Sequence, residues 1–489
     1  MTSEFQILLS ILLPLAGAVG IAIADRRYPD LREAVTLVTA ASLAVVVWTL
    51  LPELLAGERP SVRVAEMLPG LAIEFQVEPL GMLFAALASL LWIINSIYSI
   101  GYMRGNNEQH QTRFYILFAV ALSAVLGIAF AGNLLTLFIF YEILTLSTYP
   151  LVAHKGDAKT VVSARTYLGI LLATSIGLFL PAMIWTYHVA GTLDFIPGGI
   201  LDGHLAGPAV GLLLALYVFG IGKAAVMPVH RWLPAAMVAP TPVSALLHAV
   251  AVVKAGVFTI TKVVVYIFGV DFLFTESSAD WLLFAAAFTV IAASVVALRQ
   301  TNLKRLLAYS TIAQLSYVVM AVAILKPLSE VGAAIHIVAH AFGKITLFFA
   351  AGSIYTAAKK TEIHQLRGIG RRMPWTMAAF TIGALSMIGI PPTAGFVSKW
   401  YILAGSFQSE NYVAIVTIIV STALNALYFL PIIFYAWFCR EEVAPATDHG
   451  EAPLAIVIAL TATAALTVLL FLFNQPLLDL ASQLGGMPK

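Results

Sequence analysis

Apolar runs about 20 residues long, roughly the length that crosses a bilayer as a helix, recur along the whole sequence. Charged residues make up only 11% of the chain and hydrophobic residues 60%, whereas a soluble domain carries about 25% charged residues. A chain with this many apolar runs cannot bury them all in one soluble core. The sequence therefore predicts an all-α polytopic membrane protein.

Fourteen windows fit a membrane-spanning helix. They are 5–24, 32–52, 80–101, 113–131, 133–152, 161–188, 208–228, 242–269, 280–298, 303–324, 330–356, 374–403, 411–437 and 452–473. The even number predicts that both termini lie on one side of the membrane. The segment 55–78 alternates weakly between apolar and polar residues, which favours a short surface hairpin.

The basic residues divide unevenly between the two sets of loops. Loops that follow odd-numbered spans hold eighteen lysines and arginines, whereas the opposite face holds only Arg59, Arg63, Lys326 and Lys489. Because basic loops stay on the cytoplasmic side, we expect both termini on the outer side of the cell (inner) membrane. The first apolar run lacks a basic start and a cleavage site, so it is interpreted as a span and not a signal peptide.

A small set of ionisable residues remains inside the predicted spans. It comprises one carboxylate, five lysines and three histidines: Glu142, Lys223, Lys254, Lys262, Lys344, Lys399, His248, His336 and His340. Ionisable groups at membrane depth are costly, and by default they indicate function.

Glu142 lies near the middle of the fifth span, and Lys223 stands where the seventh span begins to break. One interpretation is a carboxylate that only pins two helices together. The other is a carboxylate whose protonation depends on a nearby lysine, since burial and an adjacent ammonium shift its pKa in opposite directions. Such a pair can load and release a proton.

In the eleventh span, His336, His340 and Lys344 follow one another at intervals of four residues and share one helix face. A metal site would need a third ligand, and the lysine would repel a cation, so no metal is expected. The remaining alternatives are packed core histidines and a proton relay, because histidine titrates near neutrality.

The eighth span carries His248 and Lys254, which do not share a face. Lys262, eight residues past Lys254, lies nearer the outer end of the span. It either joins Lys254 or extends to the interface by snorkelling.

Prolines interrupt two spans next to a lysine. Pro228 follows Lys223 in the seventh span, and Pro391 and Pro392 precede Lys399 in the twelfth. Paired interruptions in two halves are typical of inverted-repeat transporters. We therefore expect three N-terminal spans in 1–111, inverted five-helix repeats in 112–270 and 279–437, and a last span in 438–489.

These motifs resemble the antiporter-like subunits shared by Mrp-type cation/proton antiporters, respiratory complex I and membrane-bound hydrogenases. The resemblance covers roughly residues 80–435 and rests on Glu142, on Lys223 with the following MPVHRWLPAAMVAPTPVSALLHA, and on 302–310, with the histidines and prolines above. It implies a proton path at the membrane midplane through Glu142, Lys223, Lys254, His336, His340, Lys344 and Lys399. Lysine at 399 is similar to the D-type component of Mrp antiporters, whereas His248 is similar to other branches.

The function implied is proton movement within a multi-subunit sodium/proton antiporter, with H+ and Na+ as the ions and other membrane subunits and the bilayer as partners. The alternatives are the same module in a redox-driven complex, quinone-linked or hydrogenase-linked, and a scaffold subunit whose charges only lock helices. We expect no enzymatic activity of the chain by itself and no cofactor, because it has no flavin, iron–sulfur or nucleotide motif. The single cysteine, Cys439, excludes an internal disulfide. The sequence has no basic arm of the kind that binds nucleic acid, so we expect no nucleic-acid partner.

Overall fold

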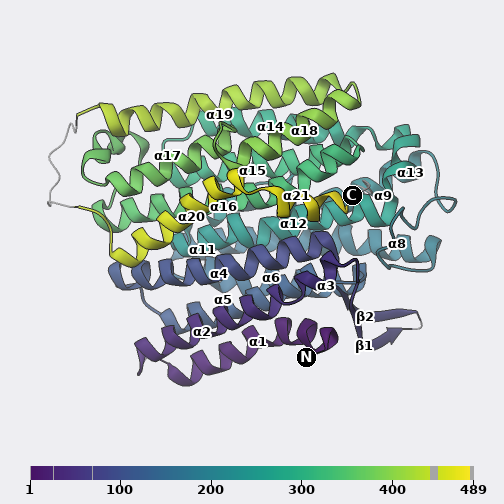
Figure 1. Ribbon diagram of the computed structural model, residues 1–489, viewed down its shortest axis with the longest axis horizontal. Helices are drawn as coiled ribbons and strands as arrows, with labels where there is room; N and C mark the ends of the chain where they lie inside the picture. The colour runs from purple at the N-terminus through teal and green to yellow at the C-terminus, as the bar shows by residue number, and fades with distance from the viewer. Residues whose placement is uncertain (1, 26, 69, 441–449, 485–489) are drawn as a thin grey trace.

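The computed structural model describes residues 2–25, 27–68, 70–440 and 450–484, in which apolar helices run side by side along one direction (Figure 1). The first half contains α1 (Ser3–Ala24), α2 (Pro29–Trp48), α3 (Leu51–Leu55), β1 (Ser61–Leu68), β2 (Leu71–Gln76), α4 (Pro79–Gly105), α5 (Gln111–Ala129), α6 (Leu134–Val152), α7 (Ala158–Thr174), η1 (Ser175–Phe179), α8 (Leu180–Ala190), α9 (Pro208–Gly220), η2 (Gly222–Ala224), α10 (Trp232–Ala235) and η3 (Ala236–Val238).

The second half contains α11 (Thr241–Ala245), η4 (Leu246–Val250), α12 (Val252–Lys262), η5 (Val263–Phe268), α13 (Val270–Thr275), η6 (Ser277–Ala279), α14 (Trp281–Leu298), α15 (Leu303–Ala323), α16 (Pro327–Ala358), η7 (Ile363–Leu366), η8 (Ile369–Arg371), α17 (Pro374–Ile388), α18 (Ala394–Gln408), α19 (Tyr412–Phe438), α20 (Leu454–Leu472) and α21 (Gln475–Ser482).

Within the described residues, eleven helical segments are long and apolar enough to cross a membrane, and each coincides with a predicted span. The seventh, eighth and twelfth predicted spans are interrupted helices instead. The breaks after α9 and between α17 and α18 confirm the two predicted interruptions. The π-helical turns η4 and η5 in the eighth span were not predicted, because no proline marks them. The total of fourteen crossings and the inverted repeats stay predictions.

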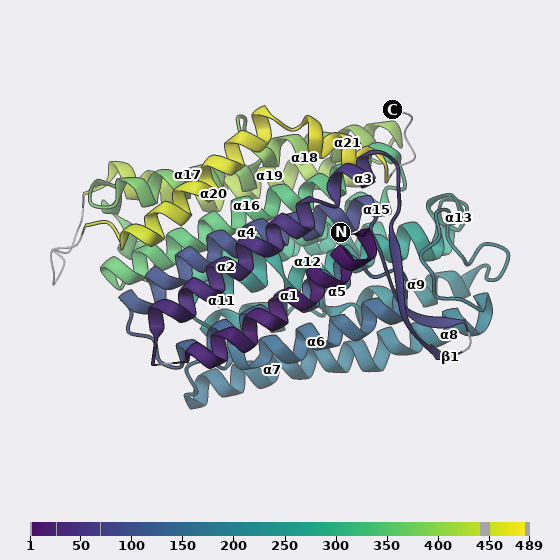
Figure 2. The ribbon, with the colours of Figure 1, turned by 60° about the horizontal axis from the view of Figure 1, so that its bottom comes forward.

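Helix α16 forms the core of the second half of the bundle (Figures 1 and 2). It packs against α4, α11, α15, α17, α18 and α20, and its most apolar stretch is entirely buried. Its 32 residues correspond to a length of about 48 Å. Gly352 permits close packing against α4, because a Cβ there would lie 2.1 Å from the Tyr98 hydroxyl oxygen. The side chains of this buried stretch therefore have no direct access to lipid.

One end of the bundle, named the hairpin end, carries the β1–β2 hairpin and both ends of the described chain. The strands pair antiparallel from Ser61 opposite Gln76 to Leu68 opposite Leu71, which confirms the predicted hairpin. Near the N-terminus, the Ser3 hydroxyl donates to Glu53 at 2.6 Å. Near the C-terminus, Arg59 donates to the Gln483 side chain at 2.9 Å. These contacts place the two ends of the chain at the same end of the bundle.

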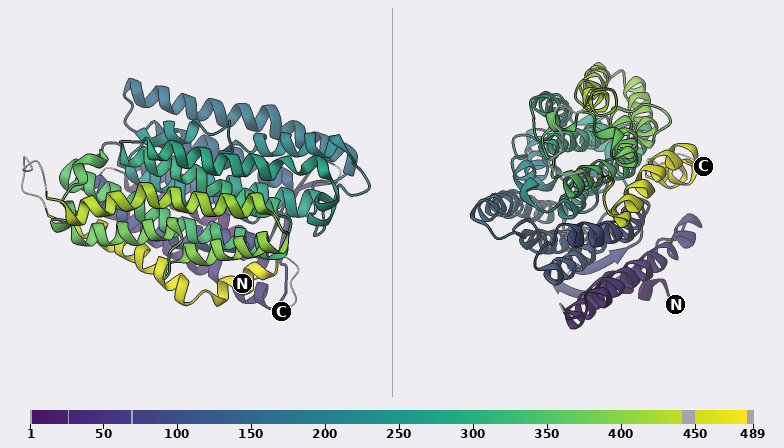
Figure 3. Two further views of the ribbon diagram at one scale, coloured as in Figure 1. Left: turned by 90° about the horizontal axis from the view of Figure 1, so that it is seen from above. Right: turned by 90° about the vertical axis from the view of Figure 1, so that its left-hand side faces the viewer.

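The opposite end, named the basic end, gathers the described loops that follow odd-numbered predicted spans. Figure 3 shows the bundle from above and from one end. Hydrogen bonds link these loops: Lys359 donates to Asn106 at 2.6 Å and Lys304 to the Ala239 carbonyl at 2.6 Å. The uneven division of basic residues therefore corresponds to the two ends of the bundle. The side of the membrane that each end faces stays a prediction.

Candidate functional site

The break between α17 and α18 leaves two backbone carbonyls without helical partners. In a continuous helix the carbonyls of Met387 and Ile388 would accept hydrogen bonds from residues 391 and 392, but both are prolines and have no N–H. The Lys399 ammonium takes their place, with Nζ 3.0 Å from the Met387 oxygen and 2.9 Å from the Ile388 oxygen. A cation at this position also complements the C-terminal end of the α17 dipole.

Glycine and two amides shape the same break. Gly389 ends α17 with φ 91°, a conformation that disfavours a side chain. The side-chain amides of Gln314 and Asn425 also donate to the Met387 oxygen, at 3.3 and 3.2 Å. Three donors from three helices thus converge on one carbonyl exposed by the prolines, which fixes the position of Lys399.

Lys223 occupies the break after α9 and is fully buried. Its Nζ donates to the Tyr141 carbonyl at 2.7 Å and to the Thr145 hydroxyl at 2.6 Å, and it lies 3.1 Å from the centre of the Tyr141 ring. The carbonyl and hydroxyl accept two of its three protons, and the ring face offers a further favourable contact for a cation. Lys223 is thereby anchored on α6.

Glu142 is the neighbour of Tyr141 on α6, and its carboxylate oxygens are both buried without a hydrogen-bond partner. It interacts electrostatically with Lys223, but within the described chain no ion pair joins the two side chains. The lysine binds the backbone of α6 and Thr145 instead. Both Glu142 carboxylate oxygens thus lack the hydrogen bonds that buried polar groups normally make.

Lys254 and His340 form the central contact of the site. The Lys254 Nζ lies 2.7 Å from His340 Nδ1, and both side chains are fully buried. Lys254 follows the π-helical turn η4, a feature often found at functional sites. The sequence predicted both residues as members of one path but did not predict their direct contact.

His336 continues the connection along α16 towards Lys399. Its ring centre lies 6.1 Å from that of His340, and its Nδ1 lies 2.9 Å from the Ser398 hydroxyl, next to Lys399 in the chain. The Tyr317 ring lies 5.7 Å from the His336 ring and 4.9 Å from Lys399 Nζ. The structure therefore brings together Lys254, His340, His336 and Lys399; with Lys223 we call these five residues the central row.

Gly256 joins the two halves of the central row. A Cβ at this position of α12 would lie 2.2 Å from the Ala224 nitrogen and 2.3 Å from the Lys223 carbonyl carbon. Only a glycine lets α12 approach the break at this distance. The backbone beside Lys254 therefore packs directly against the backbone of Lys223.

Lys344 lies on the same helix as the two histidines but points elsewhere. Its Nζ donates to the Leu307 carbonyl at 3.2 Å and lies 5.8 Å from the Phe429 ring centre. Lys344 is fully buried. It interacts electrostatically with Lys254, and its place in the proton path stays a prediction.

Two predicted residues need separate mention. The side chain of His248 lies outside the described part of the structure, although its backbone belongs to η4. Pro228 lies in the segment that follows Lys223 and precedes α10. Among the described residues, His, Cys, Asp and Glu side chains form no group of three that could hold a metal ion.

Lys262 shows that the snorkelling alternative was wrong. Its side chain is 1% exposed and forms an ion pair with Glu78 at 2.8 Å, and it also donates to the Ala131 carbonyl at 2.9 Å. Glu78 and the equally buried Glu330 were overlooked, because both stand at the beginning of a helix and were counted with the loops. A proline lies within three residues of each glutamate and marks the start of its helix, which was the available sign that the glutamate belongs to the helix.

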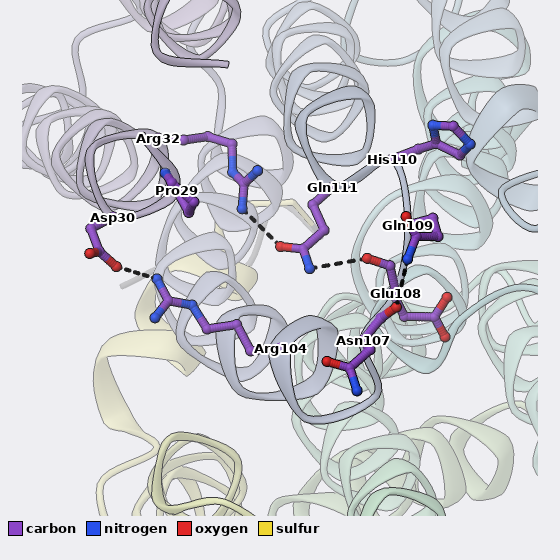
Figure 4. A pocket seen from close by; sticks show the side chains of 9 residues that line it. All are labelled: Pro29, Asp30, Arg32, Arg104, Asn107, Glu108, Gln109, His110 and Gln111. Atoms are coloured by element: carbon purple, nitrogen blue, oxygen red, sulfur yellow. Dashed lines mark hydrogen bonds and ion pairs between the residues drawn. The ribbon is translucent and has the colours of Figure 1, made fainter. Parts of the chain in front are cut away.

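A polar pocket of about 540 Å³ lies at the basic end, apart from the central row (Figure 4). Arg104 contacts Asp30 and Glu33 at 2.5 Å each, and Arg32 donates to Gln111 at 2.8 Å. Each arginine thus has polar partners within the pocket. These contacts tie α2, α4 and the start of α5 together, so we assign the pocket a structural role.

His154, in the loop after α6 at the same end, is 3% exposed. Its ring packs edge to face against Phe114, with ring centres 6.0 Å apart. Burial, and secondarily the nearby Arg113 guanidinium, lower the pKa of His154 to about 4. It is therefore neutral at physiological pH.

Comparison with known proteins adds the family context. The family model described as "NADH:quinone oxidoreductase/Mrp antiporter, TM" matches residues 131–425. The N-type component of the NADH-quinone oxidoreductase of Desulforudis audaxviator is 31% identical over 98% of this chain and 98% of its own length. The D-type component of the Na(+)/H(+) antiporter of Alkalihalophilus pseudofirmus is 27% identical over 83% of each chain.

A solved structure also matches nearly the whole chain. A chain of the Mrp complex from Dietzia sp. superposes with a TM-score of 0.87 and 23% identity, covering 99% of this chain and 97% of that one. At this identity the similarity establishes the fold. It supports the assignment of the interrupted helices as part of a shared architecture.

Proposed function

This chain belongs to the NADH:quinone oxidoreductase/Mrp antiporter membrane family, and from that premise we propose that it moves protons within a multi-subunit membrane complex. It is an antiporter-like, multi-pass membrane protein. The proposed path is the central row, with Glu142 and Lys223 at its beginning and Lys399 at its end. The inverted repeats 112–270 and 279–437 would each supply one helix that is interrupted by proline next to a lysine.

The contact between Lys254 and His340 is the observation that carries this proposal. Their nitrogens lie 2.7 Å apart, within the distance for direct proton transfer. A histidine can accept a proton on one ring nitrogen and release one from the other. Residues that only hold two helices together would need no more than a pair of opposite charges. Lys254 and His340 are instead two bases in direct contact, which is the arrangement that proton transfer requires.

Glu142 and Lys223 supply the proposed switch at the start of the row. Lys223 is bound to α6 through Tyr141 and Thr145, and Glu142 has no hydrogen-bond partner in the described structure. If Lys223 turns from Thr145 to Glu142, the ion pair favours an ionised carboxylate, and Glu142 releases its proton. The released proton moves on along the central row, and when Lys223 returns to Thr145 the Glu142 carboxylate takes up a new proton from the entry side.

Our first candidate for the whole complex is a sodium/proton antiporter, supported by the similarity to the D-type component of an Na(+)/H(+) antiporter and to an Mrp complex chain. The second is a redox-driven, quinone-linked complex, supported by the 31% identity to a component of a quinone oxidoreductase over almost the full length. In both cases partner subunits would supply the remaining parts of the complex. We place the complex in the cell (inner) membrane with both termini outside.

The test is proton flux in proteoliposomes that contain the purified complex. We expect Glu142→Ala and Lys223→Ala each to abolish flux while the complex still elutes intact. Glu66→Ala, at an exposed position of the hairpin, is the matched control and should keep normal flux. Full flux in both path variants would refute proton transport by this chain and leave the scaffold role. Flux that requires Na+ supports the antiporter, and flux that requires a quinone and a reductant supports the redox complex.

A further inference from the structure

The hairpin end contains a cavity that the central row does not use. It measures about 690 Å³ and lies between the segment before α4, the end of η5 and the start of α16. Its charged lining residues are Arg59, Glu78, Asp271, Lys326 and Glu330. Three carboxylates thus face one hollow at this end of the bundle. We call this cavity the vestibule.

Glu330 lines the vestibule from the first turn of α16 and is only 4% exposed. In the described structure its carboxylate has no hydrogen bond and no ion pair, and it interacts electrostatically with Asp271. The Lys326 Nζ lies 4.4 Å from the centre of the Phe274 ring. In the described structure Lys326 forms no ion pair with Glu330. A buried carboxylate without a partner is costly when ionised, so Glu330 is suited to hold a proton.

The vestibule ends at the ion pair between Glu78 and Lys262. The two charged atoms lie 2.8 Å apart, and the Lys262 Nζ also lies 3.8 Å from the Phe195 ring centre. Glu78 lines the cavity, while Lys262 is fully enclosed behind it. The pair therefore connects the cavity to the interior of α12.

Lys262 and Lys254 belong to the same helix, eight residues or about 12 Å apart along its axis. Phe258 lies one turn from each, and its ring centre is 5.5 Å from Lys262 Nζ. Phe258 also packs against Phe84 of α4, with ring centres 5.1 Å apart. Phe258 thus lies between Lys262 and Lys254 along α12, and Phe84 holds its ring from α4.

We propose that the vestibule is a proton port at the hairpin end, in which Glu330 exchanges protons with the solvent and the Glu78–Lys262 pair passes them to Lys254 when Phe258 moves aside. This inference rests on the proposed proton transport by the central row. It adds a second access route, formed by α4, α12 and α16, to the row that runs from α6 to α18. The ligand of the port is the proton, carried by water or hydronium.

The proton balance is simple. A proton from solvent binds the Glu330 carboxylate and passes to the Glu78 carboxylate, which turns the ion pair into a neutral acid beside an ammonium. When Phe258 moves aside and water enters, the Lys262 ammonium gives one proton through that water to the neutral Lys254 amine. The Glu78 acid reprotonates the Lys262 amine and restores the ion pair. One proton has moved from the vestibule to the central row, and no other group has changed.

The port is tested by blocking the vestibule after the complex has assembled. In a Cys439→Ser background, Val270→Cys places a thiol on the vestibule wall, and Val64→Cys places one at an exposed position of the hairpin outside it. The complex is treated in detergent with a cationic methanethiosulfonate, freed of reagent and reconstituted. We expect labelled Val270→Cys to lose proton flux about tenfold, equivalent to about 1.4 kcal/mol of added barrier, and labelled Val64→Cys to keep it.

A second variant and one reference variant complete the design. Glu330→Gln should lower flux about tenfold as well, since the amide cannot carry the proton. Unchanged flux in both labelled Val270→Cys and Glu330→Gln would overturn the port. If Glu142→Ala stops flux in that same series, the proposed function stands and only the port fails. If Glu142→Ala leaves flux intact, the proposed function itself fails.

Discussion

Replacing Gly256 by alanine tests whether the two halves of the central row must touch. The new Cβ would lie 2.2 Å from the Ala224 nitrogen and 2.3 Å from the Lys223 carbonyl carbon, whereas non-bonded heavy atoms prefer about 3.5–4.0 Å. Because both obstacles are backbone atoms, α12 or the break must move by about 1 Å or more. Overpacking of this kind costs about 1–3 kcal/mol.

The functional loss should be of similar size to the loss of stability. A misplacement of about 1 Å can cost about 10²-fold in rate, so we expect Gly256→Ala to reduce proton flux by one to two orders of magnitude in complexes that still assemble. The assays are thermal unfolding of the purified complex and proton uptake in proteoliposomes.

The matched control for this prediction is Gly169→Ala. Gly169 lies in α7 with no atom close to the position of a Cβ, so the same substitution adds only helix propensity, worth up to about 1 kcal/mol. It should keep normal flux and equal or higher stability. Wild-type flux in Gly256→Ala would refute the argument that close contact between α12 and the break positions Lys223 and Lys254.

Three further predictions concern other parts of the chain. Lys399→Met removes the donor shared by two carbonyls at the end of α17, and we expect a loss of about 1–3 kcal/mol in thermal unfolding together with loss of flux; unchanged stability would contradict the anchoring role. Glu33→Gln leaves the buried Arg32 without its carboxylate partner and should lower the free energy of unfolding by about 3 kcal/mol. Asp30→Asn, at a side chain 92% exposed, should lower it by less than about 1 kcal/mol. Equal losses would refute the distinction between the buried and the exposed ion pair. His154 has a folded pKa of about 4, below an unfolded value of about 6.5. The unfolded chain therefore binds more protons between these values, and stability should fall by about 2 kcal/mol from pH 7 to pH 5; His154→Asn should remove that slope in unfolding curves recorded against pH.

Features within one helix could be predicted from the sequence because they depend on local rules. The prolines at 391 and 392 end a helix wherever they occur in it, and the spacing of His336 and His340 places both on one face of α16. The division of basic residues likewise separated the two ends of the bundle. All three patterns reappear in the structure.

Contacts between helices could not be predicted in the same way, because they depend on packing. Glu142 and Lys223 were expected to pair, but the Lys223 ammonium donates its hydrogen bonds to the Tyr141 carbonyl and the Thr145 hydroxyl instead. The contact of Lys254 with a histidine 86 positions away has no local signature. The π-helical turns of the eighth span also leave no trace in composition.

The roles of the buried carboxylates at helix starts were missed for a related reason. Glu78 and Glu330 were counted with the loops, since each precedes or begins a span. In the structure both side chains are buried, and Glu78 becomes the partner of Lys262. Burial of a helix start depends on tertiary neighbours that a linear pattern does not contain.

Proton flux through the complex with Lys254→Met tests the central claim most directly. This substitution removes the nitrogen that lies 2.7 Å from His340 and keeps a side chain of similar length. Lys359→Met, at an exposed lysine of the basic end, is the control for loss of a positive charge. The account predicts no measurable flux in Lys254→Met and normal flux in Lys359→Met, with both complexes intact. Normal flux in Lys254→Met would show that protons do not pass along the central row.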